Sequence, residues 1–280
     1  MDILAKAATY VGFVLALGAG TFARFAFPEP PAAVRRALAW GIAVGALLVA
    51  AGAVLDVAAV LDRVARGRVD LELIRSYATA TQHGRASTVR VGIAVVAAAW
   101  GLRALGPRGA DRLAYGVLAL VWLGTAAWVG HSGAMGAAGA AASLAHLVAV
   151  VAWAGVLLWL AWLPVWSDGP GVARAVAWVG RVGLIAVVVL AATGVAMARL
   201  HLEPLAAISS SAYGAALIAK LVLVVAVVAT AAANRFRRVP AFRRGARGPL
   251  LRAVRLESLL LAAVVLATAV LATRTPVHGP

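Results

Sequence analysis

The sequence has no cysteine, only two lysines and only ten acidic residues among its 280 positions. Without cysteine the chain can form neither disulfides nor thiolate metal sites, so a soft metal ion would have to bind imidazole or thioether groups. Charged residues make up 13% of the chain and hydrophobic residues 64%, whereas about a quarter of the residues in a soluble domain are charged. The composition therefore excludes an ordinary soluble domain.

Other familiar patterns are also missing. No segment alternates between apolar and polar residues with a period of two, which excludes an outer-membrane barrel. No glycine-rich phosphate loop, catalytic triad or pair of facing carboxylates can be recognised. We therefore expect a helical membrane protein that is not an enzyme.

What the sequence has instead is a series of long apolar stretches. A helix needs about 20 apolar residues to cross a bilayer, and its backbone polar groups are then paired internally. We predict an all-α membrane protein, a bundle of about eight transmembrane helices, at 7–27, 37–60, 88–105, 112–131, 142–165, 173–199, 212–234 and 254–273. The third stretch is the weakest because Arg90 and Arg103 lie near its ends. The first lacks a clear signal-peptide cleavage site, so we expect it to be retained.

The arginines predict the orientation of this bundle. The loop between the last two helices carries eight arginines and no acidic residue between positions 235 and 255. With eight helices, this loop and three others share one side of the membrane with 16 basic residues, against nine on the opposite side. The positive-inside rule places the richer side in the cytoplasm and both termini outside, in the periplasm. The excess of arginine over lysine is typical of a GC-rich prokaryotic gene, so the expected location is a prokaryotic inner (plasma) membrane.

The helices divide into two predicted segments. Residues 1–106 form an N-terminal three-helix segment with a long extracytoplasmic loop at 61–87, which we expect to fold as a surface helix or a lid. Residues 107–280 form a five-helix domain.

Every histidine and both internal methionines fall on the predicted outer side. Imidazole and thioether are the groups that copper prefers when cysteine is absent. Asp56 could add an oxygen ligand or orient a histidine. The predicted metal ligands are His131, His146, Met135, His83, His201, Met197 and Asp56, whereas His278 belongs to the C-terminal tail.

The pair of His131 and His146 is the centre of this prediction. The segment between the two histidines is small, uncharged and contains three glycines, so it can hold two helix ends close together. We expect His131 to end the fourth helix and His146 to lie in the first turn of the fifth. A hydrogen bond between helices is the structural alternative to a metal site.

Two charged residues inside predicted spans need partners, because an isolated charge in the membrane is costly. We expect Lys220 to pair with Asp56, with reaching the interface or guarding a pore as alternatives. We expect Glu257 to pair with Arg252 or Arg255.

Three blocks of the C-terminal half resemble the copper-resistance D (CopD-like) family of membrane proteins. The residues that carry this resemblance are Gly130, His131, Leu144, His146, Trp153 and Gly155 in the first block, Tyr213, Gly214, Lys220, Asn234 and Arg235 in the second, and Arg255, Glu257, Thr275 and Pro276 in the third. The resemblance covers roughly residues 110–277. It implies a copper-handling protein of the inner membrane that often works with a small periplasmic copper-binding partner, and no such domain is fused here.

Three functions remain open from the sequence. In the first, copper ions are captured outside by histidine and methionine and are transferred into or across the membrane. In the second, His131 and His146 hold a b-type haem between facing helices. The third is a metal-free assembly or scaffold protein. The net charge of +16 fits contact with anionic lipids of the bilayer, and we expect no nucleic-acid partner.

Overall fold

The computed structural model describes residues 1–65, 69–103, 109–129, 136–166, 169–201 and 211–274. All regular secondary structure in these residues is helical, with π-helical segments labelled η. The elements in chain order are α1 (Asp2–Thr21), η1 (Phe22–Ala26), α2 (Ala32–Ala65), α3 (Leu71–Ala80), α4 (Gln82–Arg103), α5 (Gly109–Val129), α7 (Ala137–Val150), η2 (Val151–Gly155), α8 (Val156–Trp162), α9 (Gly169–His201), α10 (Ala212–Ala233), η4 (Asn234–Arg238), α11 (Val239–Arg243) and α12 (Arg247–Leu271).

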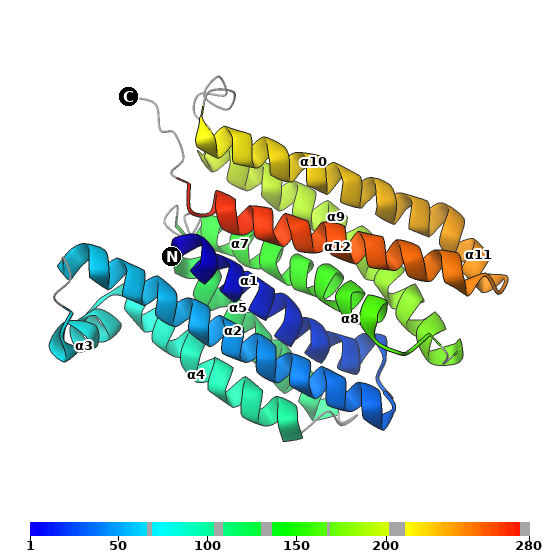
Figure 1. Ribbon diagram of the computed structural model, residues 1–280, viewed down its shortest axis with the longest axis horizontal. Helices are drawn as coiled ribbons and strands as arrows, with labels where there is room; N and C mark the ends of the chain where they lie inside the picture. Colours follow the sequence, from blue (N-terminus) through cyan, green and yellow to red (C-terminus); the bar gives the residue numbers. More distant parts are fainter. Residues whose placement is uncertain (66–68, 104–108, 130–135, 167–168, 202–210, 275–280) are drawn as a thin grey trace.

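The long helices lie alongside one another and alternate in direction along the chain (Figure 1). The start of α1, helix α3 and the end of α12 lie at one end of the bundle, and α11 lies at the opposite end. We refer to these as the α3 end and the α11 end. All the described residues that were predicted as metal ligands belong to the half of the bundle nearer the α3 end.

Seven helical segments of the described chain are long and apolar enough to cross a membrane: Asp2–Ala26, Ala32–Ala65, Arg112–Val129, Ala137–Trp162, Gly169–Arg199, Ala212–Arg243 and Arg247–Leu271. Large apolar side chains also cover their outer surface, for example Ile185 and Val225, which are 63% and 68% exposed. A bilayer solvates such a surface at no cost. The prediction of a multi-pass helical membrane protein is therefore confirmed.

The expected third span is the exception. Residues 88–105 fall largely within α4, which packs along α2 but is not among the seven segments. The described part of α4 opens with the polar side chains of Gln82, His83 and Arg85 and also carries Arg90, and these four residues lower its mean hydropathy. The count of eight spans and the outside location of the termini remain predictions.

Most of the predicted 61–87 loop is helical. α2 continues to Ala65 and α4 begins at Gln82, so α3 is the main feature between them. Asp70 caps α3, because its Oδ1 accepts a hydrogen bond of 2.7 Å from the Leu73 amide, one of the amides that a helix start leaves unpaired. No residue of α3 is buried, as expected for a surface helix. The proposed division of the chain at residue 106 stays a prediction.

Close glycine contacts join the first helix to the C-terminal half. A Cβ atom on Gly18 would lie 2.6 Å from the Cα atom of Gly155 in η2, so any larger residue would push α1 away from η2. Small residues let helix backbones approach in this way inside membranes.

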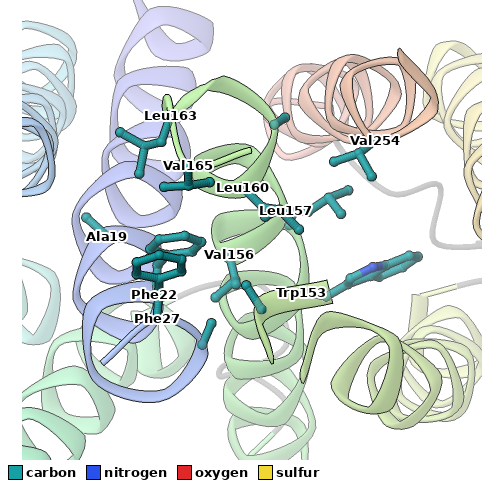
Figure 2. Packing of buried hydrophobic residues seen from close by; sticks show 14 of the residues in the cluster. Ala19, Phe22, Phe27, Trp153, Val156, Leu157, Leu160, Leu163, Val165 and Val254 are labelled. Atoms are coloured by element: carbon teal, nitrogen blue, oxygen red, sulfur yellow. The ribbon is translucent and has the colours of Figure 1, made fainter. Parts of the chain in front are cut away.

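A buried apolar cluster completes this junction. Phe22 and Phe27 stack with ring centroids 5.8 Å apart, and they lie on one side of Val156 while Trp153 lies on the other (Figure 2). Leu160 and Val254 belong to the same cluster. The cluster fastens α1, α8, α9 and α12 together, and it holds Trp153 in a defined position.

Candidate functional site

The seven predicted ligands fall into three groups in the structure. His131 and Met135 lie outside the described residues, so their predicted roles are untested. His201 is the last residue of α9, where we expected a loop, and its side chain also lies outside the described part. His146 and Met197 belong to α7 and α9, and His83 and Asp56 join the first four helices.

His146 lies in the third turn of α7, not the first, because that helix begins at Ala137, five residues earlier than expected. The ring is directed at α9, where its Nδ1 is 2.9 Å from Oγ1 of Thr193. The Thr193 hydroxyl has a second contact of 2.6 Å with the carbonyl oxygen of Val189. A carbonyl can only accept, so the hydroxyl proton goes to Val189 and Oγ1 must accept from His146.

This arrangement determines the tautomer of the imidazole. When Nδ1 carries the proton, Nε2 of neutral His146 carries the lone pair. A hydrogen bond from the non-ligating nitrogen to a protein oxygen is the usual support of a metal-binding histidine. His146 is therefore oriented in the form that can bind a metal ion through Nε2.

Met197 follows Thr193 by four residues, which places both on the same face of α9. Its side chain is half-buried. Because α9 runs toward the α3 end, Met197 lies about one turn nearer that end than the contact between His146 and Thr193. A thioether on the approach to an imidazole suits a soft metal ion.

Lys220 does not pair with Asp56, contrary to our expectation. It lies in the interior of α10. The ion pairs found among the described residues involve Lys6, Arg63 and His83 as their basic partners, so Lys220 has no such carboxylate partner in this part of the chain.

Asp56 belongs to a separate polar cluster. Its Oδ2 accepts hydrogen bonds from Nζ of Lys6 at 2.8 Å and from Nε2 of His83 at 3.0 Å. His83, in the first turn of α4, also contacts the Tyr77 hydroxyl through Nδ1 at 2.8 Å. Burial raises the pKa of Tyr77, so the phenol stays protonated at neutral pH. The cluster ties α1, α2, α3 and α4 together at the α3 end.

The described residues contain no group of three or more histidine, aspartate and glutamate side chains placed to hold one metal ion. Asp56 and His83 already bond to each other and to neighbours. The sequence prediction grouped these two residues with His146 because all three lie toward the same end of the bundle. Composition and topology alone do not show which of these residues are close enough to share one metal ion.

A third cluster was missed by sequence reasoning. Glu257 in α12 is buried and does not pair with Arg252 or Arg255. Its carboxylate instead accepts a hydrogen bond from the side-chain amide nitrogen of Asn234. Arg238 donates to the side-chain oxygen Oδ1 of Asn234 at 2.9 Å.

Trp153 and Asn234 both lie in π-helical turns, η2 and η4, a feature that often accompanies functional sites. The two residues and Glu257 come from three different sequence blocks of the resemblance described above. Their presence in those blocks was the sequence signal that could have identified the cluster. Regular helical periodicity does not predict where a π-turn occurs, and such a turn changes which face of the helix a side chain occupies. The three residues line a cavity of about 170 Å³ between α8, α9, α10 and α12.

Two family models match this chain. The model described as Copper resistance protein D-like, N-terminal domain, matches residues 1–140, and the model described as Copper resistance protein D matches residues 173–271. No curated protein and no solved structure matches the chain. The first match spans helices α1 to α5, and the second spans most of α9 to α12.

Proposed function

Because the chain belongs to the copper resistance protein D-like family, we propose that it captures copper ions at the α3 end of the bundle and transfers them into or across the membrane. Copper is the cargo in this proposal, and the protein catalyses no reaction. The observation that carries the proposal is the hydrogen bond from His146 to Thr193, which leaves Nε2 of a membrane histidine with its lone pair.

The ligand set of the proposed site is soft. His146 supplies an imidazole and Met197 a thioether, and His131, Met135 and His201 are the further ligands that the sequence predicts near the same end. Two or three such ligands suit Cu(I), since copper binds imidazole and thioether sulfur when thiolate is absent. Asp56 and His83 would join the site only after leaving Lys6 and Tyr77.

The arginines support the proposed direction of approach. Arg235, Arg237, Arg238, Arg243 and Arg244 all lie near the α11 end, and the positive-inside rule assigns that end to the cytoplasm. The α3 end would then face the periplasm of a prokaryotic inner membrane. A small periplasmic copper-binding protein is the expected donor.

The proposal is tested with detergent-purified protein by measuring metal content and a visible spectrum. We compare the wild type, a His131→Ala/His146→Ala double variant and a His278→Ala control, which removes a histidine that we assign to the tail. The expected result is copper bound to the wild type and the control, but lost from the double variant at unchanged helical content.

Three results would overturn the proposal. A Soret band that disappears in the double variant would identify bound haem, held by the histidine pair. Neither copper nor a Soret band in the wild type, even after incubation with Cu(I), would leave a metal-free scaffold. Copper that remains in the double variant would place the site elsewhere in the chain.

A further inference from the structure

The cavity beside Glu257 opens toward the outside of the bundle. Helix α9 packs on α7 and α10 packs on α12, but α9 and α10 make few contacts with each other. The walls between them are apolar and include Gly183, Leu184 and Val187 from α9 and Val228 from α10. Leu184 is 54% exposed, so the groove reaches the surface that faces lipid.

Basic groups lie at the end of this groove nearer α11. Arg235 lines the groove and donates from Nη1 to the Gly180 carbonyl oxygen at 2.7 Å. The guanidinium of Arg235 therefore lies beside the backbone of the residue that precedes Arg181. Both arginine side chains are exposed, and no described carboxylate of α9 to α12 forms an ion pair with either.

The height of these arginines matches a membrane interface. From Arg181, α9 continues for 17 uncharged residues to Arg199, a length of about 25 Å at the helical rise per residue. This is close to the apolar thickness of a bilayer, about 30 Å. The headgroups of the leaflet on the α11 side would thus lie level with Arg181 and Arg235, and acyl chains would extend along the groove.

We propose that the groove between α9 and α10 is a binding site for one anionic phospholipid. Arg181 and Arg235 hold the phosphate, and one acyl chain lies against Leu184, Val187 and Val228. Charge complementarity selects an anionic headgroup, since Arg181 and Arg235 are exposed cations without a described carboxylate partner. The cavity of about 170 Å³ resembles in size the apolar cavities known to hold small hydrocarbons. This site is independent of copper.

Native mass spectrometry of the detergent-purified full chain tests the proposal, with phosphatidylglycerol and phosphatidylcholine as probes. We expect one phosphatidylglycerol to bind tightly and phosphatidylcholine to bind weakly. In Arg181→Gln/Arg235→Gln the affinity for phosphatidylglycerol should fall about 25-fold, since each arginine near an anionic lipid contributes about fivefold. The control, Arg237→Gln, removes one positive charge from the segment that carries Arg235, at a position outside the groove, and should change affinity less than twofold.

A second variant tests the apolar part of the site. Val228→Trp fills the groove without changing any charge and should also abolish tight binding. An equal loss of phosphatidylglycerol affinity in Arg237→Gln would show that general surface charge, and not the groove, binds the lipid. Normal lipid binding by Val228→Trp would show that no acyl chain lies in the groove. Displacement of the lipid by millimolar inorganic phosphate would show a phosphate site instead of a lipid site.

Discussion

Thr193 accepts a hydrogen bond from Nδ1 of His146 while its own proton goes to the carbonyl of Val189. One hydroxyl on α9 therefore determines which nitrogen of a histidine on α7 is available to a metal ion. The contact also crosses the interface between α7 and α9, and the outer part of α9 carries Met197 and His201. The imidazole is consequently both a candidate ligand and a link between helices.

Thr193→Val should weaken copper binding about 10- to 100-fold, the usual effect of removing the hydrogen-bond partner of a ligating histidine. Competition with a chromophoric Cu(I) chelator measures the change. Thr230→Val is the matched control, because the Thr230 hydroxyl bonds only to the Ala226 carbonyl of its own helix. Equal affinities for the two variants would show that Thr193 does not orient a copper ligand.

Asp56→Ala should lower the free energy of unfolding. Its removal leaves the ammonium of Lys6 and the imidazole of His83 without their shared carboxylate. Breaking a buried ion pair costs roughly 3–5 kcal/mol, and because Lys6 and His83 are partly exposed, we expect a smaller loss of about 1–2 kcal/mol. Thermal unfolding in detergent measures it, and Asp62→Ala, at an exposed position of the same helix, is the control. Loss of bound copper at unchanged stability would instead make Asp56 a copper ligand.

Glu257→Ala should destabilise the C-terminal helices more than Glu257→Gln does. The alanine variant leaves the side-chain amide donor of Asn234 without its acceptor, and an unpaired buried donor costs about 1–3 kcal/mol. The glutamine variant keeps one carbonyl oxygen as an acceptor. Thermal unfolding compares both with Arg252→Ala, an exposed position on α12. Equal melting temperatures for the two Glu257 variants would show that this hydrogen bond does not hold the cluster together.

Gly18→Ala should separate α1 from η2, because the new Cβ would lie 2.6 Å from Gly155 Cα. Overpacking of this kind costs about 1–3 kcal/mol. Gly116→Ala is the control: no atom lies within 4 Å of a Cβ at that position, and an alanine in a helix gains about 0.5–1 kcal/mol over glycine. The unfolding temperature should fall in the first variant and rise slightly in the second. A fall of the same size in both would contradict the close contact.

The helical membrane class followed from local properties of the chain. Apolar length alone predicts which segments span, so most of the spans could be located without tertiary information. α4 shows the limit of this approach: it is a helix near the predicted position, but its described part is not among the apolar segments. Its buried Arg90 bonds to Thr125 of α5, a partner that hydropathy cannot reveal.

The sequence by itself determined the residue types available at each end of the bundle: soft ligands toward the α3 end and arginines toward the α11 end. Only the tertiary structure decided which of them meet. His146 bonds to Thr193, Asp56 bonds to Lys6 and His83, and Glu257 bonds to Asn234. The physical reason is that hydropathy places a residue along the membrane normal, whereas its neighbours depend on helix rotation and packing, which glycine contacts and π-turns set between segments far apart in the chain.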